Sequence, residues 1–235
     1  TRWLREWIDP KVSDIELSEK LTMAGLEVER VGPVAPPFEG LVVGHVVSCV
    51  KHPNADKLSL CEVDIGVDGN LQIICGAPNV RKGLKVVVAT VGSVLPNNLK
   101  IKKAKLRGVE SRGMICSEAE MGLSDCHDSI MELDSSAILG ENARTCLDLD
   151  DHIIELDLTP NRGDCFSVLG IAREVCANYD LSLFLKNYEA KQQGSKSFKA
   201  KVSNPNACPK YLTRVIEGID NNAVTPKWMA QRLQR

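Results

Sequence analysis

Five short apolar segments between Leu41 and Ser117 restrict the fold of this chain most strongly, because each alternates as a β-strand does. Turns rich in glycine, proline and asparagine separate them, and no helical pattern lies between them, which argues against a parallel α/β sheet. Five strands in about 100 residues are typical of a small closed barrel such as the OB-fold. The segments are Leu41–Val50, Leu58–Ile65, Leu71–Cys75, Lys85–Val91 and Met114–Ser117.

Helical patterns flank these strands on both sides. Residues 1–30 have helical apolar spacing, and Ser13–Glu16 forms a capping box with Ser13 as the N-cap. The segment Val31–Gly40 holds three prolines and two glycines, which predicts a linker. Further along, His152–Leu158 is a predicted strand, and Asp164 is the predicted N-cap of a second helix.

The last 50 residues give a weaker pattern. Residues 186–200 are rich in lysine, glutamine and serine and predict a second linker. Lys201–Ile219 has a β-like pattern, and Thr225-Pro226 predicts the start of a helix. Because the first residue is threonine and the last lies within this helix, we expect the chain to be a piece of a longer protein.

Charge is distributed unevenly along the chain, although the formal net charge is only −2. Residues 81–112 hold nine basic side chains and one acid, whereas residues 113–155 hold eleven acids and one base, Arg144. A basic stripe of this kind attracts a phosphate backbone, although a basic run is more often a solvated surface. The stripe has no aromatic residue for base stacking, which favours the backbone and shape of a folded RNA over general single-strand binding.

The loop His52–Leu58 joins the first two predicted strands. Pro53 stiffens it, Asn54 and Asp56 can form Asx turns, and Lys57 can reach a phosphate. On chemistry alone, a rigid turn with a surface ion pair between Asp56 and Lys57 is the favoured interpretation.

The same loop resembles a known family. His52–Leu58, Cys75–Asn79 and Leu106–Met114 are similar to the tRNA-binding barrel found in several aminoacyl-tRNA synthetases and in free-standing tRNA-binding proteins. The flanking segments Trp3–Trp7, Thr22–Glu29 and Leu158–Cys165 are similar to the N-terminal part of the β subunit of bacterial phenylalanine–tRNA ligase. The resemblance runs through essentially the whole chain.

This resemblance implies a domain organisation. An OB-fold barrel over residues 36–145 is inserted into a discontinuous α+β domain of residues 1–35 and 146–190, and residues 198–235 are the truncated start of an editing domain of the B3/B4 type. The family implies a cytoplasmic α2β2 ligase that uses ATP and Mg²⁺ to attach phenylalanine to its tRNA. It also implies that the aminoacylation site lies on the α subunit and that the editing pocket lies outside this chain, so we expect no catalytic residue and no metal site here.

Several alternatives stay open. A stand-alone tRNA-binding or assembly adaptor is the second hypothesis, and a barrel that mainly supports assembly is a third. Asp125, His127 and Asp128 are better explained by a surface turn than by a metal or acid–base site. Nine cysteines without close pairing suit a reduced, cytosolic protein, and the longest apolar run is far shorter than the roughly 20 residues of a membrane span.

The predicted RNA-binding residues lie in the first loop and along the basic stripe. They are Lys51, His52, Asn54, Asp56, Lys57, Arg81, Lys82, Lys85, Lys100, Lys102, Lys103, Lys105, Arg107 and Arg112.

Overall fold

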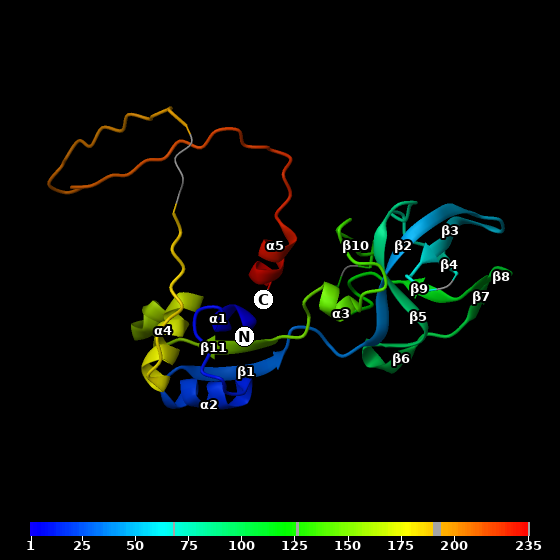
Figure 1. The fold of residues 1–235 in the computed structure, drawn as a ribbon, viewed down its shortest axis with the longest axis horizontal. Helices are drawn as coiled ribbons and strands as arrows, with labels where there is room; N and C mark the ends of the chain where they lie inside the picture. Colours follow the sequence, from blue (N-terminus) through cyan, green and yellow to red (C-terminus); the bar gives the residue numbers. More distant parts are fainter. Residues whose placement is uncertain (68, 126, 190–193, 235) are drawn as a thin grey trace.

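The computed structural model describes residues 1–67, 69–125, 127–189 and 194–234. The residues outside these ranges include Cys126, which is one of the nine cysteines, and Ala190 and Arg235, which end two of the predicted domains. Figure 1 shows a β-rich part, coloured blue-cyan to green, and a smaller part that brings together blue and yellow segments.

A large antiparallel sheet forms the β-rich part. Its hydrogen-bonded order is β10-β5-β2-β3-β4, and β6 and β9 also pair with β5. Each of the five predicted strands is confirmed by one of these elements. Their bounds are β2 (Glu39–His52), β3 (Ala55–Asp64), β4 (Leu71–Cys75), β5 (Lys85–Leu95), β6 (Leu99–Lys100), β9 (Gly113–Ile115) and β10 (Glu132–Leu133), with η1 (Pro96–Asn98) between β5 and β6.

The alternation of apolar residues places one face of these strands in a core. Val46, Val63, Ile73 and Val88 are fully buried in one cluster, since inward-facing residues recur with a period of two along each strand. At β4, the last strand of this order, Arg112 N donates to Gln72 O at 2.8 Å. No ladder joins β4 to β9 among the described residues, so the pairings show a large antiparallel sheet and leave the closed five-stranded barrel a prediction.

A separate hairpin projects from this sheet. β7 (Ala104–Leu106) pairs with β8 (Val109–Ser111), with Leu106 opposite Val109. Arg107 and Gly108 make the turn with φ of 47° and 92°, and positive φ at both central residues is what a type I′ turn requires. The segment 100–107 lies between two of the predicted strands, where we expected only a loop, and part of it is a strand.

The smaller part joins elements from before and after the large sheet. β1 (Glu27–Pro33) pairs antiparallel with β11 (His152–Asp157), and the helices α1 (Arg2–Arg5), α2 (Asp14–Met23) and α4 (Val168–Tyr179) lie beside this pair in Figure 1. Leu17, Leu21, Ala172 and Val175 are fully buried in one shared core. The extent of this discontinuous domain, as predicted, remains a proposal.

Two sequence predictions in this part are wrong, and one is confirmed. Glu27–Pro33 is a strand and not the end of a helical segment running into a linker, because β11 supplies its hydrogen-bond partners. Asp164 lies in η2 (Pro160–Cys165) and bonds Arg162, while Ser167 caps α4 by accepting from Gly170 N at 2.9 Å. The N-cap role of Ser13 is confirmed, since its hydroxyl accepts from Glu16 N at 3.1 Å.

Arg144, the one basic residue of the acidic segment, holds together the two connections between the parts. It follows Asn142, the N-cap of the short helix α3 (Ala143–Cys146). Its guanidinium donates to the carbonyls of Pro36 at 3.0 Å and Leu149 at 3.3 Å, and to Asp150 at 2.6 Å. A single, partly buried guanidinium therefore ties the segment by which the chain enters the β-rich part to the segment by which it leaves.

The C-terminal segment departs from its prediction. Residues 194–226 contain no strand, so the β-like pattern of Lys201–Ile219 is not realised. Alternation alone does not stabilise a strand when no neighbour satisfies its backbone groups. The helix α5 (Lys227–Gln234) follows.

Candidate nucleic-acid interface

The exposed cations of the candidate interface gather on the hairpin β7–β8 and the segment before it. We call residues 102–112 the basic hairpin. Lys102, Lys103, Lys105 and Arg107 are all exposed on it. The only acid of the basic hairpin is Glu110, whose carboxylate accepts from Arg112 Nε at 2.5 Å. This bond, with Lys103 and Lys105 close by, holds the pKa of Glu110 below its usual range. The hairpin thus keeps a net positive charge of four.

The loop between β2 and β3 touches the end of this hairpin. His52 Nε2 lies 3.3 Å from Leu106 O, and Asn54 Nδ2 donates to Arg107 O at 3.1 Å. Two motifs that are more than 50 residues apart, the His-Pro-Asn loop and the basic hairpin, therefore form one surface. Exposed Lys51 and Lys57 flank the loop on its two strands. We call the basic hairpin with Lys51 and Lys57 the hairpin surface.

His52 does not belong to the exposed set that the sequence predicted. It is only 5% exposed, and Nδ1 accepts from Asn54 N at 3.1 Å. Because the ring is buried and both of its nitrogens lie within hydrogen-bond distance of backbone atoms, His52 lies behind the hairpin surface and not on it. The side-chain amide of Asn54 donates to Arg107 O, while Asp56 lies exposed at the start of β3.

The other predicted cations lie elsewhere. Arg81, Lys82 and Lys85, which we call the Arg81 region, lead from β4 into β5, where Gly83 N donates to Val46 O at 2.8 Å. Val46 is five residues from Lys51, which is about 17 Å along an extended strand. The predicted single basic stripe is therefore divided into two regions. Lys100 is exposed on β6, which pairs with the distal end of β5.

Arg81 is engaged by an acid, unlike the lysines of the hairpin surface. Its two terminal nitrogens donate to the two oxygens of Glu132 at 2.8 and 2.9 Å, and Nη1 also donates to Asn79 O at 3.2 Å. The hydrogen bond with Glu132 raises the pKa of Arg81, and the same bond lowers the pKa of Glu132. A bidentate pair of this kind leaves Arg81 little charge to offer a second anion.

One group among the described residues has the composition of a metal site: Asp164, Cys165 and Glu174. Arg162 occupies its centre, since Nη2 lies 2.7 Å from Glu174, 3.0 Å from Cys165 Sγ and 3.3 Å from Asp164. A guanidinium already neutralises these acids, and a thiol is a poor ligand for Mg²⁺, so the group does not fit that ion. Asp125, His127 and Asp128 are exposed in a segment of bends.

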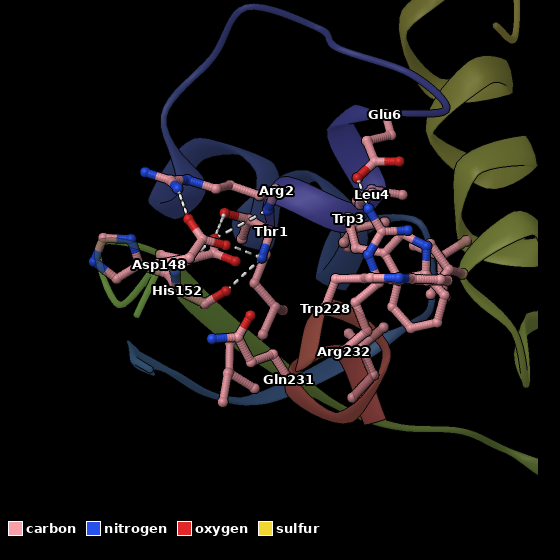
Figure 2. A pocket seen from close by; sticks show the side chains of 17 residues that line it. Thr1, Arg2, Trp3, Leu4, Glu6, Asp148, His152, Trp228, Gln231 and Arg232 are labelled. Carbon is pink, nitrogen blue, oxygen red and sulfur yellow. Dashed lines mark hydrogen bonds and ion pairs between the residues drawn. The ribbon is translucent and has the colours of Figure 1, made fainter. Parts of the chain in front are cut away.

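A pocket lies in the smaller part, between α1, β11 and α5 (Figure 2). Its polar side chains are engaged with one another: Arg232 pairs with Glu6, and its guanidinium lies 5.6 Å from the ring centres of both Trp3 and Trp228. None of the predicted RNA-binding residues lines this pocket. The thiols of Cys49, Cys61, Cys75, Cys116, Cys165, Cys176 and Cys208 form no disulfide. No helix within the described ranges is long and apolar enough to cross a membrane.

An antiparallel β-domain with an exposed basic hairpin beside its first loop is an arrangement found in small nucleic-acid-binding domains. The family described as "Putative tRNA binding domain" matches residues 41–142, which contain both the loop and the hairpin. Over its whole length, the chain is related to the β subunits of phenylalanine–tRNA ligases, as the resemblance of its motifs indicates.

The relatives include subunits from several bacteria. Identity is 52% over 99% of this chain for the β subunit of Dickeya dadantii, 52% over 100% for that of Coxiella burnetii and 50% over 99% for that of Yersinia pestis. The chain spans only 29–30% of the length of these relatives. Among solved structures, a MetRS related protein from Pyrococcus horikoshii matches 55% of this chain and 95% of its own at 19% identity, with a TM-score of 0.32, which supports no further statement.

Proposed function

We propose that this chain is the tRNA-binding N-terminal part of the β subunit of a phenylalanine–tRNA ligase. The observation that carries the proposal is the hairpin surface, where exposed lysines and Arg107 meet the loop between β2 and β3. If β2, β3, β4, β5 and β9 are the five strands of an OB-fold barrel, this loop and the hairpin are its L12 and L45 loops. Those loops flank the face on which OB-folds bind oligonucleotides.

The RNA contact is electrostatic. The cations that we propose to touch phosphates are Lys51, Lys57, Lys100, Lys102, Lys103, Lys105, Arg107 and Arg112, with Lys82 and Lys85 as a second group. Phosphate contacts position an RNA but do not read its sequence, so this part contributes affinity more than choice of tRNA. The remaining specificity falls to other parts of the enzyme.

The larger assembly is also a proposal. Its activity is the ATP-dependent attachment of phenylalanine to its tRNA in the cytoplasm, in an α2β2 enzyme whose α subunit carries the aminoacylation site. ATP and Mg²⁺ serve that site. Among the described residues, the candidate metal group of Asp164, Cys165 and Glu174 is already filled by Arg162. Residues 1–35 and 146–190 form the discontinuous domain around the barrel, and 198–235 begin the editing domain.

A stand-alone adaptor is the second candidate. It would need the barrel but neither the flanking α+β part nor the C-terminal segment. The relatives match 99–100% of this chain, flanks included, which favours the ligase subunit.

The test is the binding of fluorescent tRNA to the 235-residue chain, followed by polarisation at several salt concentrations. We expect a dissociation constant of roughly micromolar or weaker and a slope of log K against log salt near −3 to −4, as about four phosphate contacts give. Phenylalanine tRNA and an unrelated tRNA should bind almost equally. Binding that does not change with salt would overturn the electrostatic contact, and no binding would favour a barrel that serves assembly.

A further inference from the structure

We propose that His52 is a positioning residue, which holds the basic hairpin in the orientation in which it meets RNA. The inference rests on the proposed RNA binding and adds to it a residue that touches no phosphate. It reassigns the histidine of the His-Pro-Asn loop from a ligand to a support.

The hydrogen bonds of His52 define its protonation. Asn54 N can only donate, so Nδ1 of His52 is an acceptor with a free lone pair. Leu106 O can only accept, so Nε2 carries the hydrogen and donates across 3.3 Å. The ring is thus the neutral Nε2–H tautomer, and its two nitrogens link the turn of one loop to the turn of another.

The basic hairpin needs this support because its two ends are held differently. Its base is tied to β4, where Gln72 Nε2 donates to Glu110 O at 2.7 Å and Ile74 N donates to Ser111 Oγ at 3.1 Å. Its tip lies on the surface, since Leu106, Arg107 and Gly108 are all exposed. A two-stranded ribbon without a core is marginal on its own.

His52 and Asn54 are what join the tip to the sheet, through the consecutive carbonyls of Leu106 and Arg107. With the tip held, Lys103, Lys105 and Arg107 are presented to RNA in a fixed arrangement. If these two hydrogen bonds are lost, the tip becomes mobile and RNA binding must first order it. The free-energy cost of ordering one or two side chains and their backbone weakens binding by about fivefold to tenfold.

Two substitutions test separately the hydrogen bonds that the two nitrogens of His52 make. His52→Asn keeps an acceptor near the position of Nδ1, as in an Asx turn, but its side chain is too short to reach Leu106 O. His52→Gln places an amide donor near the position of Nε2 but no acceptor at Nδ1. We expect His52→Asn to weaken tRNA binding by about fivefold to tenfold, and His52→Gln to stay within about twofold of the wild type.

The matched control is His45→Asn, the same change at the other histidine of β2, away from the hairpin; it should leave binding unchanged. The lysines give a second control. In a chain that already carries Lys102→Ala, Lys103→Ala and Lys105→Ala, His52→Asn should add less than it does in the wild type, because only Arg107 remains of the three cations that the held tip presents. A merely structural histidine would give the same loss in both backgrounds.

Hydrogen exchange measured without RNA separates this inference from the proposed function. His52→Asn should speed the exchange of the amides at 106–109 and leave those of β2, β3 and β5 protected, whereas His52→Gln should keep the tip protected. If His52→Asn unfolds the sheet, Asn54→Ala provides the second variant, since Asn54 is exposed and its amide holds Arg107 O.

Equal behaviour of His52→Asn and His52→Gln in exchange and binding would overturn the inference, as would a tip that exchanges no faster in either His52→Asn or Asn54→Ala. If the exchange pattern is as expected but the wild type binds no tRNA, the proposed function fails while the support of the hairpin by His52 stands.

Discussion

The hairpin surface and the Arg81 region have similar sequences but different available charge. In both, basic residues follow one another closely, yet Lys102, Lys103 and Lys105 are exposed around a single acid, whereas Arg81 is held on both of its terminal nitrogens by Glu132. The acid that pairs with Arg81 comes from β10, 51 residues further along the chain. Counting charges in a segment therefore overestimates the positive potential where the fold brings an acid from elsewhere.

The largest effect is expected at the hairpin surface. Replacing Lys102, Lys103 and Lys105 together by alanine should weaken tRNA binding by about tenfold or more and reduce the magnitude of the salt slope by one to three, because each lost phosphate contact removes about 0.9. Exposed lysines contribute little to stability, so the melting temperature should change by no more than a few degrees.

Polarisation with labelled tRNA and thermal unfolding of the same samples measure both effects. The triple variant should lose affinity equally for phenylalanine tRNA and for an unrelated tRNA. An unchanged isotherm would remove the basic hairpin from the interface and leave the β-rich part an assembly module.

The strands of the β-rich part could be predicted because their signal is local. Alternation along Leu71–Cys75, for example, needs no knowledge of the partner strand, and β4 has the predicted bounds. The capping of α2 by Ser13 is equally local. The structure departs from the sequence prediction where the deciding partner is distant, as with β1, whose partner strand β11 begins at His152.

The same limit explains the candidate site. The basic residues and the His-Pro-Asn loop could be recognised individually. However, the hydrogen-bond partner of His52 Nε2 is Leu106 O, 54 residues away, and the ion-pair partner of Arg81 is Glu132. The prediction also fails for Asp164, although its partner is near in sequence. Its carboxylate accepts a hydrogen bond from Arg162 and does not cap α4. No local pattern distinguishes a lysine that stays exposed from an arginine that finds an acid.

An intermediate effect is expected when Arg81 is released. Glu132→Gln keeps an acceptor for Asn79 Nδ2 but removes the charge that neutralises Arg81. A folded RNA is large enough to span both regions, so the freed guanidinium can take one more phosphate. We expect binding to become about twofold to threefold tighter and the salt slope steeper by up to one.

The pH dependence of this difference checks its cause. Arg81 holds the pKa of Glu132 below its usual range, so the pair persists through neutral pH and is lost only as the pH falls through that lowered pKa. The gain from Glu132→Gln should therefore be full at neutral pH and shrink in acid. A gain that is constant with pH would mean that Glu132 acts on binding other than through its charge.

The smallest effect is expected from the removal of Arg81 itself. Arg81→Ala takes away a cation that Glu132 already engages. The Arg81 region meets β2 at Val46, through Gly83, and Val46 lies about 17 Å along the strand from Lys51. This separation exceeds the Debye length of about 10 Å at 0.1 M salt, so the hairpin surface is screened from the change. Binding measured at that salt should weaken by less than twofold, with a slope within error of the wild type. A loss from Arg81→Ala as large as that from the three lysines would mean that residues 81–112 meet RNA as one continuous stripe, and that the ion pair with Glu132 opens when RNA binds.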